Sequence, residues 1–320
     1  MFEGLPRERL AFLPTPLHRL SNLGDSIGLD SLWIKRDDLT GLAFGGNKTR
    51  KLEYVVGDAK ANKCDTLVTV GALQSNHCRQ TAAAAAACGM RCILLLAGEE
   101  PEFLEGNLLL SRMMGAEIKY YPDESLFTLR NHLDEVIATL EDFGLKPYAI
   151  PEGAAMAVGS IAYAVAMEEL QQQMESEGVH FDQIIVPVGT GGTLAGMIVG
   201  AKLLGIESKL IGIAVAADAE STEQRVRDVV DMTLDRYALE HFVPDVHIDD
   251  RFLGAGYAKV DDSVRSSLEM FAKMDAIILD PVYTGKAGTA LIRMALNGDI
   301  SSDSPTLFYH TGGQPALFAF

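Results

Sequence analysis

Short apolar runs alternate along the chain with longer segments whose apolar residues recur at helical spacing. The short runs predict strands at residues 65–72, 91–98, 117–122, 183–188, 209–217 and 306–313. The longer segments predict helices near residues 75–89, 105–116, 125–143, 156–177, 192–205, 219–238, 262–275 and 285–297. Strands that alternate with helices in this way are typical of βαβ units, so the pattern predicts an α/β fold with open, twisted, mostly parallel sheets.

The chain has 320 residues, of which 48% are hydrophobic, and this length exceeds that of a usual single core. We therefore predict two lobes. Residues 49–157 form a small domain, and residues 1–48 together with 158–320 form a large domain. Ligands of such sheets bind beyond the carboxyl ends of the strands, so a site is expected at the loops 71–77, 188–193 and 311–314.

The formal net charge of −17 argues against binding to nucleic acid or to an anionic membrane surface. The first twenty residues carry charges and prolines where a signal peptide needs an apolar stretch, and the longest apolar runs are too short to cross a bilayer. The four cysteines lack CxxC spacing, and the seven histidines form no zinc-spaced cluster. We expect a cytoplasmic protein with reduced thiols and no metal site.

The segment VGTGGTLAG, residues 188–196, leads from a predicted strand into a predicted helix. Its glycines allow backbone N–H groups to approach an anion, and the helix N-terminus favours negative charge. The spacing matches neither the P-loop nor the dinucleotide fingerprint, and the acidic residue that would bind a ribose is absent. The loop suits a phosphate, although the same glycines would also suit a plain tight turn.

A second loop of this kind is GALQSNHCRQTAA, in which Ser75 and Asn76 are natural helix caps. The helix start could also bind a carboxylate, with His77 beside it. The segment GLAFGGNKTRKLEY places Lys48 after two glycines, where no core requires a lysine. A lysine in a water-poor cleft loses its charge and attacks carbonyl groups. Lys48 together with a separate phosphate loop is what an aldehyde-bearing phosphate cofactor requires, namely pyridoxal 5′-phosphate.

With these motifs assembled, the sequence resembles the fold-type II, tryptophan synthase β-like pyridoxal phosphate enzymes. Within them it is similar to the family of D-cysteine desulfhydrase and 1-aminocyclopropane-1-carboxylate deaminase. The resemblance extends from LPTPLHRL near the start to HTGGQPAL near the end, and KRDDLTGLAFGGNKTRKLEY, GALQSNHCRQTAA and LDPVYTGKA carry it most specifically. It implies the fold-type II architecture, a small amino-acid substrate and a homodimer.

The resemblance also implies roles for individual residues. It assigns cofactor binding to Lys48, Lys51, Asn76, Thr190, Gly191, Gly192, Thr193, Tyr283 and Thr284. It assigns substrate binding to Ser75, Asn76, His77, Tyr257 and Thr311. In this scheme Lys48 is attached to the cofactor aldehyde, Thr284 faces the pyridine nitrogen, and Lys48, Ser75 and Tyr283 are the candidates for moving the Cα proton.

Three positions separate the two branches of the family. The deaminase resemblance requires glutamate in place of Thr284, leucine in place of Thr311 and glutamine in place of His77. A neutral partner of the pyridine nitrogen makes a weaker hydrogen bond than a carboxylate and gives a weaker electron sink. Opening a cyclopropane needs the stronger sink, whereas expelling a thiolate from Cβ needs less. The expected reaction is β-elimination, which converts D-cysteine and water to sulfide, ammonia and pyruvate.

Other functions would use some of the same sequence features. The ring-opening deaminase is one alternative, and a related lyase that releases sulfite from cysteate or chloride from chloroalanine is another. A nicotinamide oxidoreductase would use the glycines of residues 188–196 but would leave Lys48 without a role. A non-catalytic cofactor carrier would have the same loops and no turnover.

Overall fold

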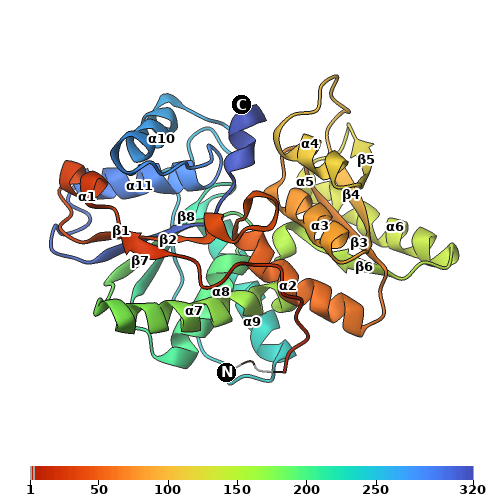
Figure 1. Cartoon of the computed structure of the whole chain (residues 1–320), viewed down its shortest axis with the longest axis horizontal. Coiled ribbons are helices and arrows are strands. Elements are labelled where there is room, and N and C mark those ends of the chain that lie inside the picture. Colours follow the sequence, from red (N-terminus) through yellow and green to blue (C-terminus); the bar gives the residue numbers. More distant parts are fainter. Residues whose placement is uncertain (1, 3, 320) are drawn as a thin grey trace.

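The computed structural model describes residue 2 and residues 4–319, in which two separate, mostly parallel sheets are covered by helices. Figure 1 shows the sheets in two lobes that lie side by side, with helix α2 between them. The predicted α/β class is confirmed. Each of the predicted strands is present, and the predicted helices are found close to their expected bounds, except that the one expected over residues 125–143 is divided into two helices.

The smaller sheet has the order β5 (Glu117–Tyr121), β4 (Arg91–Ala97), β3 (Thr66–Ala72), β6 (Pro147–Ile150), and its strands are parallel. Its helices are α3 (Asn76–Ala87), α4 (Gly106–Met113), α5 (Leu126–Leu129) and α6 (Asn131–Asp142). Alternate residues of β3 enter different core clusters, since Leu67 packs in one and Val68 with Val70 in another. Both faces of β3 are therefore buried, which explains its continuous apolar sequence.

The larger sheet has the order β1 (Leu17–Arg19), β2 (Leu32–Arg36), β10 (Thr306–His310), β7 (Gln183–Val188), β8 (Lys209–Ala214), β9 (His247–Asp249). All neighbours are parallel except β1 and β2. Its helices are α1 (Ser21–Ile27), α8 (Gly192–Leu204), α9 (Ala219–Arg236), α10 (Asp262–Asp275) and α11 (Thr284–Leu296). The second strand of the chain, β2, thus pairs with its last strand, β10.

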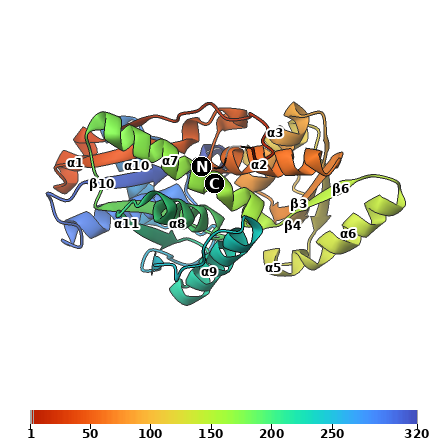
Figure 2. The same cartoon turned by 90° about the horizontal axis from the view of Figure 1, so that it is seen from below.

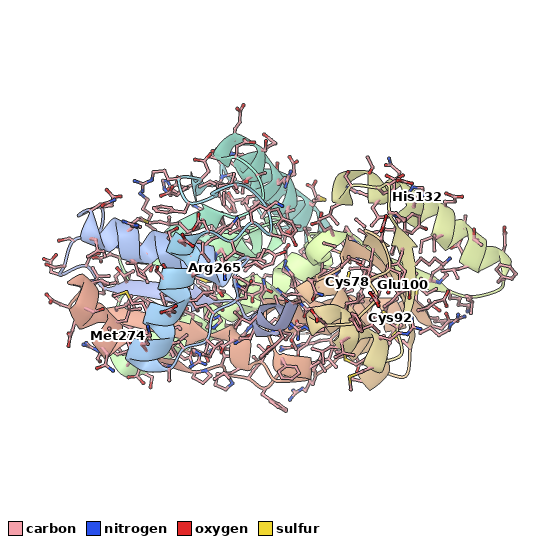
Figure 3. The ribbon with its side chains drawn as sticks, turned by 90° about the horizontal axis from the view of Figure 1, so that it is seen from above. Cys78, Cys92, Glu100, His132, Arg265 and Met274 are labelled. Atoms are coloured by element: carbon pink, nitrogen blue, oxygen red, sulfur yellow. The ribbon has the colours of Figure 1, made fainter. Side chains whose placement is uncertain are left out.

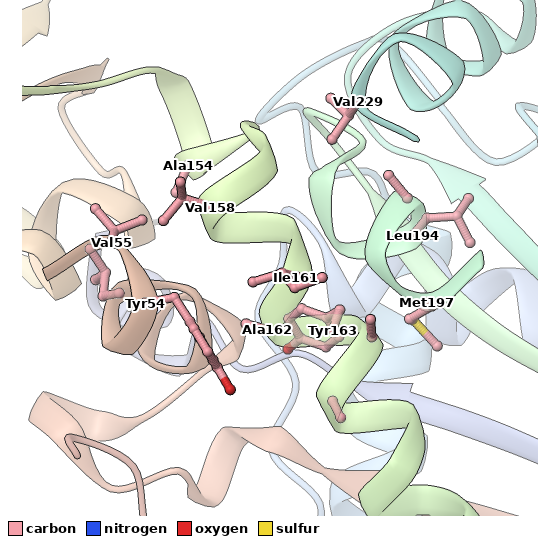
Figure 4. Packing of buried hydrophobic residues seen from close by; sticks show 14 of the residues in the cluster. Tyr54, Val55, Ala154, Val158, Ile161, Ala162, Tyr163, Leu194, Met197 and Val229 are labelled. Atoms are coloured by element: carbon pink, nitrogen blue, oxygen red, sulfur yellow. The ribbon is translucent and has the colours of Figure 1, made fainter. Parts of the chain in front are cut away.

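Helices α2 (Asn47–Ala61) and α7 (Ala157–Glu177) pack against each other. Both views of the whole chain show α2 between the lobes and α7 running along the large lobe (Figures 1 and 2). Figure 4 shows α7 between α2, which contributes Tyr54 and Val55, and α8, which contributes Leu194 and Met197. Glycines allow α8 to approach α7 closely. A Cβ at Gly196 would lie 2.0 Å from the Ser160 carbonyl oxygen, so a larger residue would force the helices apart.

A buried ionic network fixes the start of α2 to the large lobe. The Arg50 guanidinium donates to both carboxylate oxygens of Asp37 at 2.9 Å and to Glu169 at 2.8 and 2.9 Å. Lys35 also donates to Glu169 at 2.5 Å. Burial alone would raise the pKa of Glu169, but the hydrogen bonds and charges of Arg50 and Lys35 lower it to about 2.

All four cysteines are free thiols, as expected. Cys78 and Cys92 lie in the small lobe, whereas Arg265 and Met274 mark α10 in the other lobe (Figure 3). Burial raises the pKa of Cys78 to about 12, so this thiol stays protonated and unreactive near neutral pH. In the described part of the chain, no helix is long and apolar enough to span a membrane.

The two proposed domains can be compared with the sheets. Every strand of the smaller sheet lies within residues 49–157, and every strand of the larger sheet lies within residues 1–48 or 158–320. The predicted boundaries fall within the first turns of α2 and α7. The division into two domains at these residues stays a prediction.

Candidate active site

A cavity of about 140 Å³ lies where the carboxyl ends of β3, β7 and β10 meet. The ends of these strands and the loops that follow them contribute residues 71, 72, 75–77, 188–193 and 311–312 to its lining. The predicted site residues that line it are Lys48, Ser75, Asn76, His77, Thr190, Gly191, Gly192, Thr193, Tyr257, Tyr283 and Thr311. Lys51 and Thr284 are buried behind this wall and are absent from the lining.

Lys48 is the second residue of α2, and its position depends on the backbone that precedes it. Gly45 and Gly46 have φ angles of 64° and 122°, which side chains disfavour, so the turn into α2 requires glycine. The Asn47 side chain donates to the Thr193 hydroxyl at 3.0 Å and ties the helix start to the glycine loop. Burial lowers the pKa of Lys48 to about 8, with a partial offset from the charge of Glu152. A substantial fraction of this amine is therefore uncharged and nucleophilic near neutral pH.

The glycine loop and α8 form a cup for an anion. Gly191 has a φ angle of 85°, and a Cβ there would lie 3.2 Å from the Val226 backbone nitrogen. The first N–H groups of α8 have no partners within the helix and point beyond its N-terminus. The Lys51 amine lies behind the loop, where a Cβ at Gly192 would come within 2.8 Å of it. This geometry suits a phosphate.

Lys51 itself is fully buried and donates to the Gly153 carbonyl oxygen at 3.2 Å. Burial lowers the pKa of Lys51 well below its usual value, and the charge of Lys48 adds to this effect. A phosphate in the cup would offset both influences, because an adjacent anion favours the charged form of an amine.

The N-terminus of α3 provides a second anion-binding position. Ser75 caps the helix by accepting from the Cys78 N–H at 3.2 Å, so capping is part of its role. The Asn76 side-chain oxygen accepts from the Asn107 amide at 2.8 Å. Beside them, His77 is 3% exposed and its Nε2 lies 2.9 Å from the Thr69 hydroxyl. Burial, with the charges of Lys48 and Lys51, lowers the pKa of His77 well below its usual value, so the ring is neutral.

Two tyrosines that line the cavity contact each other. The hydroxyl oxygens of Tyr257 and Tyr283 lie 2.9 Å apart, and their rings meet edge to face with centroids 6.1 Å apart. Burial raises the pKa of Tyr257 to about 12, so its hydroxyl keeps its proton. The Tyr283 ring also lies against the glycine loop, 3.2 Å from where a Cβ at Gly189 would be. Tyr283 is therefore fixed on the cavity wall, where it can cover a planar ligand.

The hydroxyl of Thr284 has an unexpected environment. It donates to the Asp280 carboxylate at 2.8 Å and accepts from the Asp280 backbone N–H at 2.8 Å. The Asp280 side chain is fully buried and also accepts from the N–H groups of residues 282, 283 and 284. The hydroxyl is therefore backed by a carboxylate. The role of Thr284 toward the pyridine nitrogen stays a prediction.

Sequence reasoning missed three charged residues of the site. Glu152 and Arg225 line the cavity, and Asp280 lies directly behind it. Arg225 comes from α9, which approaches the glycine loop through Val226. The sequence signal for Asp280 was its position before Pro281 and the start of α11, since aspartate favours helix starts. Neither Glu152 nor Arg225 has a comparable sequence signal.

Comparisons with known proteins agree with this geometry. The model of the family described as pyridoxal-phosphate dependent enzyme matches residues 9–312. The chain belongs to this family. A putative 1-aminocyclopropane-1-carboxylate deaminase of Pyrococcus abyssi is 39% identical, with 100% of this chain and 95% of the relative covered. A D-cysteine desulfhydrase of Serratia proteamaculans is 37% identical, with 98% and 96% covered.

Solved structures of similar enzymes show the same architecture. The crystal structure of a homologue of ACC (1-aminocyclopropane-1-carboxylate) deaminase has a TM-score of 0.91 at 38% identity and covers 99% of this chain and 94% of its own. Threonine deaminase isoform 2 of Solanum lycopersicum shares the fold, with a TM-score of 0.67 at 17% identity over 93% of this chain and 79% of its own. The pyridoxal phosphate enzyme described here therefore has the fold-type II architecture and is a pyridoxal phosphate-dependent lyase.

The residues present fit this cofactor. A lysine with a lowered pKa, a glycine-lined helix start and a buried second amine surround one cavity. The lysine matches the cofactor aldehyde, the helix start matches its phosphate, and the second amine matches the charge of that phosphate. Among the residues that the structure describes, no group of histidine, cysteine, aspartate and glutamate is arranged to hold a metal ion.

Proposed function

We propose that this enzyme catalyses the β-elimination of D-cysteine. Water is consumed, and the products are sulfide, ammonia and pyruvate. The observation that supports this choice is the neutral hydroxyl of Thr284 at the start of α11, at the position where the deaminase resemblance requires glutamate. Bound pyridoxal phosphate withdraws electrons from the substrate Cα, which makes the Cα proton acidic.

The residues of the cavity would have the following roles. Lys48 holds the cofactor aldehyde covalently, while Lys51 and residues 190–193 hold the phosphate. The N-terminus of α3, with Ser75, Asn76 and His77, binds the substrate carboxylate. Tyr283 covers the cofactor ring, and Tyr257 reaches the substrate. Lys48, Ser75 and Tyr283 remain the candidates for moving the Cα proton, because each of them lines the cavity.

The choice between the two branches depends on the strength of the electron sink. A threonine hydroxyl bonds the pyridine nitrogen about half as strongly as a carboxylate does, and the difference corresponds to about one unit in the ring pKa. Loss of a thiolate from Cβ tolerates the weaker sink. Thr311 supports the same choice, since a polar wall stands where the deaminase resemblance requires leucine.

The related names do not decide between the branches. Relatives of similar identity are named putative 1-aminocyclopropane-1-carboxylate deaminase and D-cysteine desulfhydrase. Release of sulfite from cysteate or of chloride from chloroalanine is the alternative within the eliminating branch. A side-by-side assay tests the proposal, with D-cysteine, L-cysteine, cysteate, chloroalanine, D-serine and the cyclopropane amino acid as substrates. We expect the highest kcat/KM for D-cysteine, and 2-oxobutanoate from the cyclopropane substrate as the main product would contradict the proposal.

We also infer that the enzyme is a cytoplasmic homodimer that takes small amino acids and binds neither nucleic acid nor membranes. The family resemblance supports the dimer, and the net charge of −17 supports the lack of nucleic-acid binding. Light scattering on the purified protein measures the mass directly. A mass of one chain at micromolar concentration would contradict the dimer.

A further inference from the structure

One charged side chain in the cavity has no role in the proposed mechanism. Glu152 lines the cavity, and it is the one carboxylate among the lining residues of the described chain. Its carboxylate makes no hydrogen bond with the other residues that the structure describes, although the charges of Lys48 and Arg225 act on it. A partly buried carboxylate without such partners is unfavourable for the protein alone, so a role toward a ligand is the natural explanation.

The backbone holds Glu152 in a fixed place. It begins the short helix η3 (Glu152–Ala154), in which Gly153 and Ala154 have φ angles of 64° and 48°. Lys51 donates to the Gly153 carbonyl oxygen at 3.2 Å, and a Cβ at Gly153 would lie 2.5 Å from the Thr190 hydroxyl. The left-handed backbone at Ala154, which is fully buried, persists because these contacts determine it.

The charge of Glu152 acts on several sides of the cavity. Its nearest charged neighbours by electrostatic effect are Lys48 and Arg225, which lower the pKa that burial raises. It is also among the charges that raise the pKa of Tyr257 and Tyr283, after burial. Glu152 therefore lies on the wall of the same cavity as Lys48 of α2, Arg225 of α9 and both tyrosines, where a ligand would lie near it.

A phosphate bound at the glycine loop would attract cations of the site. Lys51 lies against Gly192, and Arg225 precedes Val226, whose backbone contacts Gly191. Lys51 therefore lies behind the loop that suits the phosphate, whereas Arg225 lines the cavity and its charge also acts on Glu152. The substrate α-carboxylate has the N-terminus of α3. A second anionic group, on the side chain of a substrate, would be repelled by the charge of Glu152 on the cavity wall.

We propose that Glu152 is a specificity-determining residue that admits amino acids with an uncharged side chain and rejects those with an anionic one. This inference rests on the proposed function, because it places an amino-acid substrate in this cavity. It ranks D-cysteine and chloroalanine above cysteate among the candidate substrates. Rejection by a like charge in a confined site is an efficient source of specificity.

Equilibrium binding of two matched ligands tests the inference without turnover. D-Asparagine and D-aspartate have nearly the same shape, differ in side-chain charge and carry no β-leaving group. Calorimetry on the cofactor-loaded enzyme measures the ratio of their Kd values, and the L-enantiomers are measured in parallel. We expect wild type to bind asparagine at least about tenfold more tightly than aspartate. In Glu152→Gln the ratio should fall to near one.

Glu177→Gln is the matched control, because Glu177 is exposed at the end of α7 and its loss removes the same charge away from the cavity. This variant should keep the wild-type ratio. A ratio unchanged by Glu152→Gln would overturn the inference, as would failure of the wild type to bind asparagine of either hand. Absent turnover of D-cysteine with a ratio that responds to Glu152→Gln would instead count against the proposed function alone.

Discussion

The Thr284 hydroxyl donates to the buried carboxylate of Asp280 across 2.8 Å, directly behind Tyr283 on the cavity wall. The hydroxyl also accepts from the Asp280 backbone N–H, so its one proton and one of its lone pairs are already used. In this arrangement Thr284 can offer a ligand a lone pair but no proton. A threonine that looks neutral in the sequence thus stands next to a buried carboxyl group, whose pKa burial raises.

This pair makes a prediction about the branch-determining position. Thr284→Glu places a second carboxylate beside buried Asp280, where two like charges cannot both be desolvated cheaply. We expect the free energy of unfolding to fall by about 2 kcal/mol or more, measured by urea denaturation. We also expect elimination from D-cysteine to slow, in stopped-flow and steady-state rates.

Thr284→Gln is the control for this experiment, because it has the same shape without the charge. A smaller loss of stability in Thr284→Gln than in Thr284→Glu would attribute the difference to repulsion by Asp280. Equal losses would mean that size alone is responsible. An elimination rate unchanged by Thr284→Glu would remove the main support for the desulfhydrase branch.

A second prediction uses the lowered pKa of Lys48. Attachment to the cofactor requires the neutral amine, and a pKa of about 8 leaves roughly a tenth of it neutral at pH 7. The rate at which apoprotein becomes covalently labelled by added pyridoxal phosphate should therefore rise about tenfold from pH 7 to pH 9 and then level off. Borohydride trapping followed by peptide mass spectrometry measures both the rate and the residue.

The label should appear on the peptide that contains Lys48, and Lys48→Ala should abolish it. Label on Lys51 or Lys286 would contradict the assignment. A rate that continues to rise up to pH 10.5, the ordinary value for lysine, would contradict the effect of burial on Lys48.

A third prediction concerns the phosphate cup. Gly191→Asp adds a side chain and a negative charge where backbone N–H groups must approach the phosphate. Cofactor affinity should fall at least about hundredfold, measured by fluorescence titration of apoprotein. Gly191→Ala separates the two effects, since it adds the strain at a φ angle of 85° without the charge. If Gly191→Asp kept wild-type affinity, the loop would be only a turn.

The ionic network beneath α2 gives a fourth prediction. Glu169→Gln removes the negative charge that balances the buried charges of Arg50 and Lys35. The free energy of unfolding at pH 7 should therefore fall by about 3 kcal/mol. Because the folded pKa of Glu169 is lowered from 4.5 to about 2, its contribution is complete above pH 4.5 and is lost as the pH falls toward 2. The difference between wild type and variant should therefore shrink over this range in acid denaturation. A constant difference would contradict the ion pair.

Much of the fold could be predicted because the buried strands are continuous apolar runs. β3 and β4 are apolar on both faces and stand out from their surroundings. Strands β1, β2, β6 and β9 were not predicted. In β9, for example, His247–Asp249 has no apolar run and gains its place only by pairing with β8. The helix expected over residues 125–143 is divided at Arg130 into α5 and α6.

The site could be predicted where its residues lie in loops after strands. Residues 190–193 follow that rule. Lys48 lies in the first turn of α2 and could be predicted because the glycines that its backbone turn requires are visible in the sequence. Glu152 and Arg225 could not be predicted, since tertiary packing alone turns them toward the cavity. Asp280 was overlooked because the sequence does not show that its side chain turns back onto Thr284.

The account is tested most directly by the products formed from D-cysteine. Purified enzyme loaded with pyridoxal phosphate should release sulfide and pyruvate in equal amounts, and Lys48→Ala should lose this turnover by several orders of magnitude. The same preparations are assayed for 2-oxobutanoate from the cyclopropane amino acid, with little expected. No sulfide from D-cysteine together with efficient formation of 2-oxobutanoate would contradict the proposed reaction.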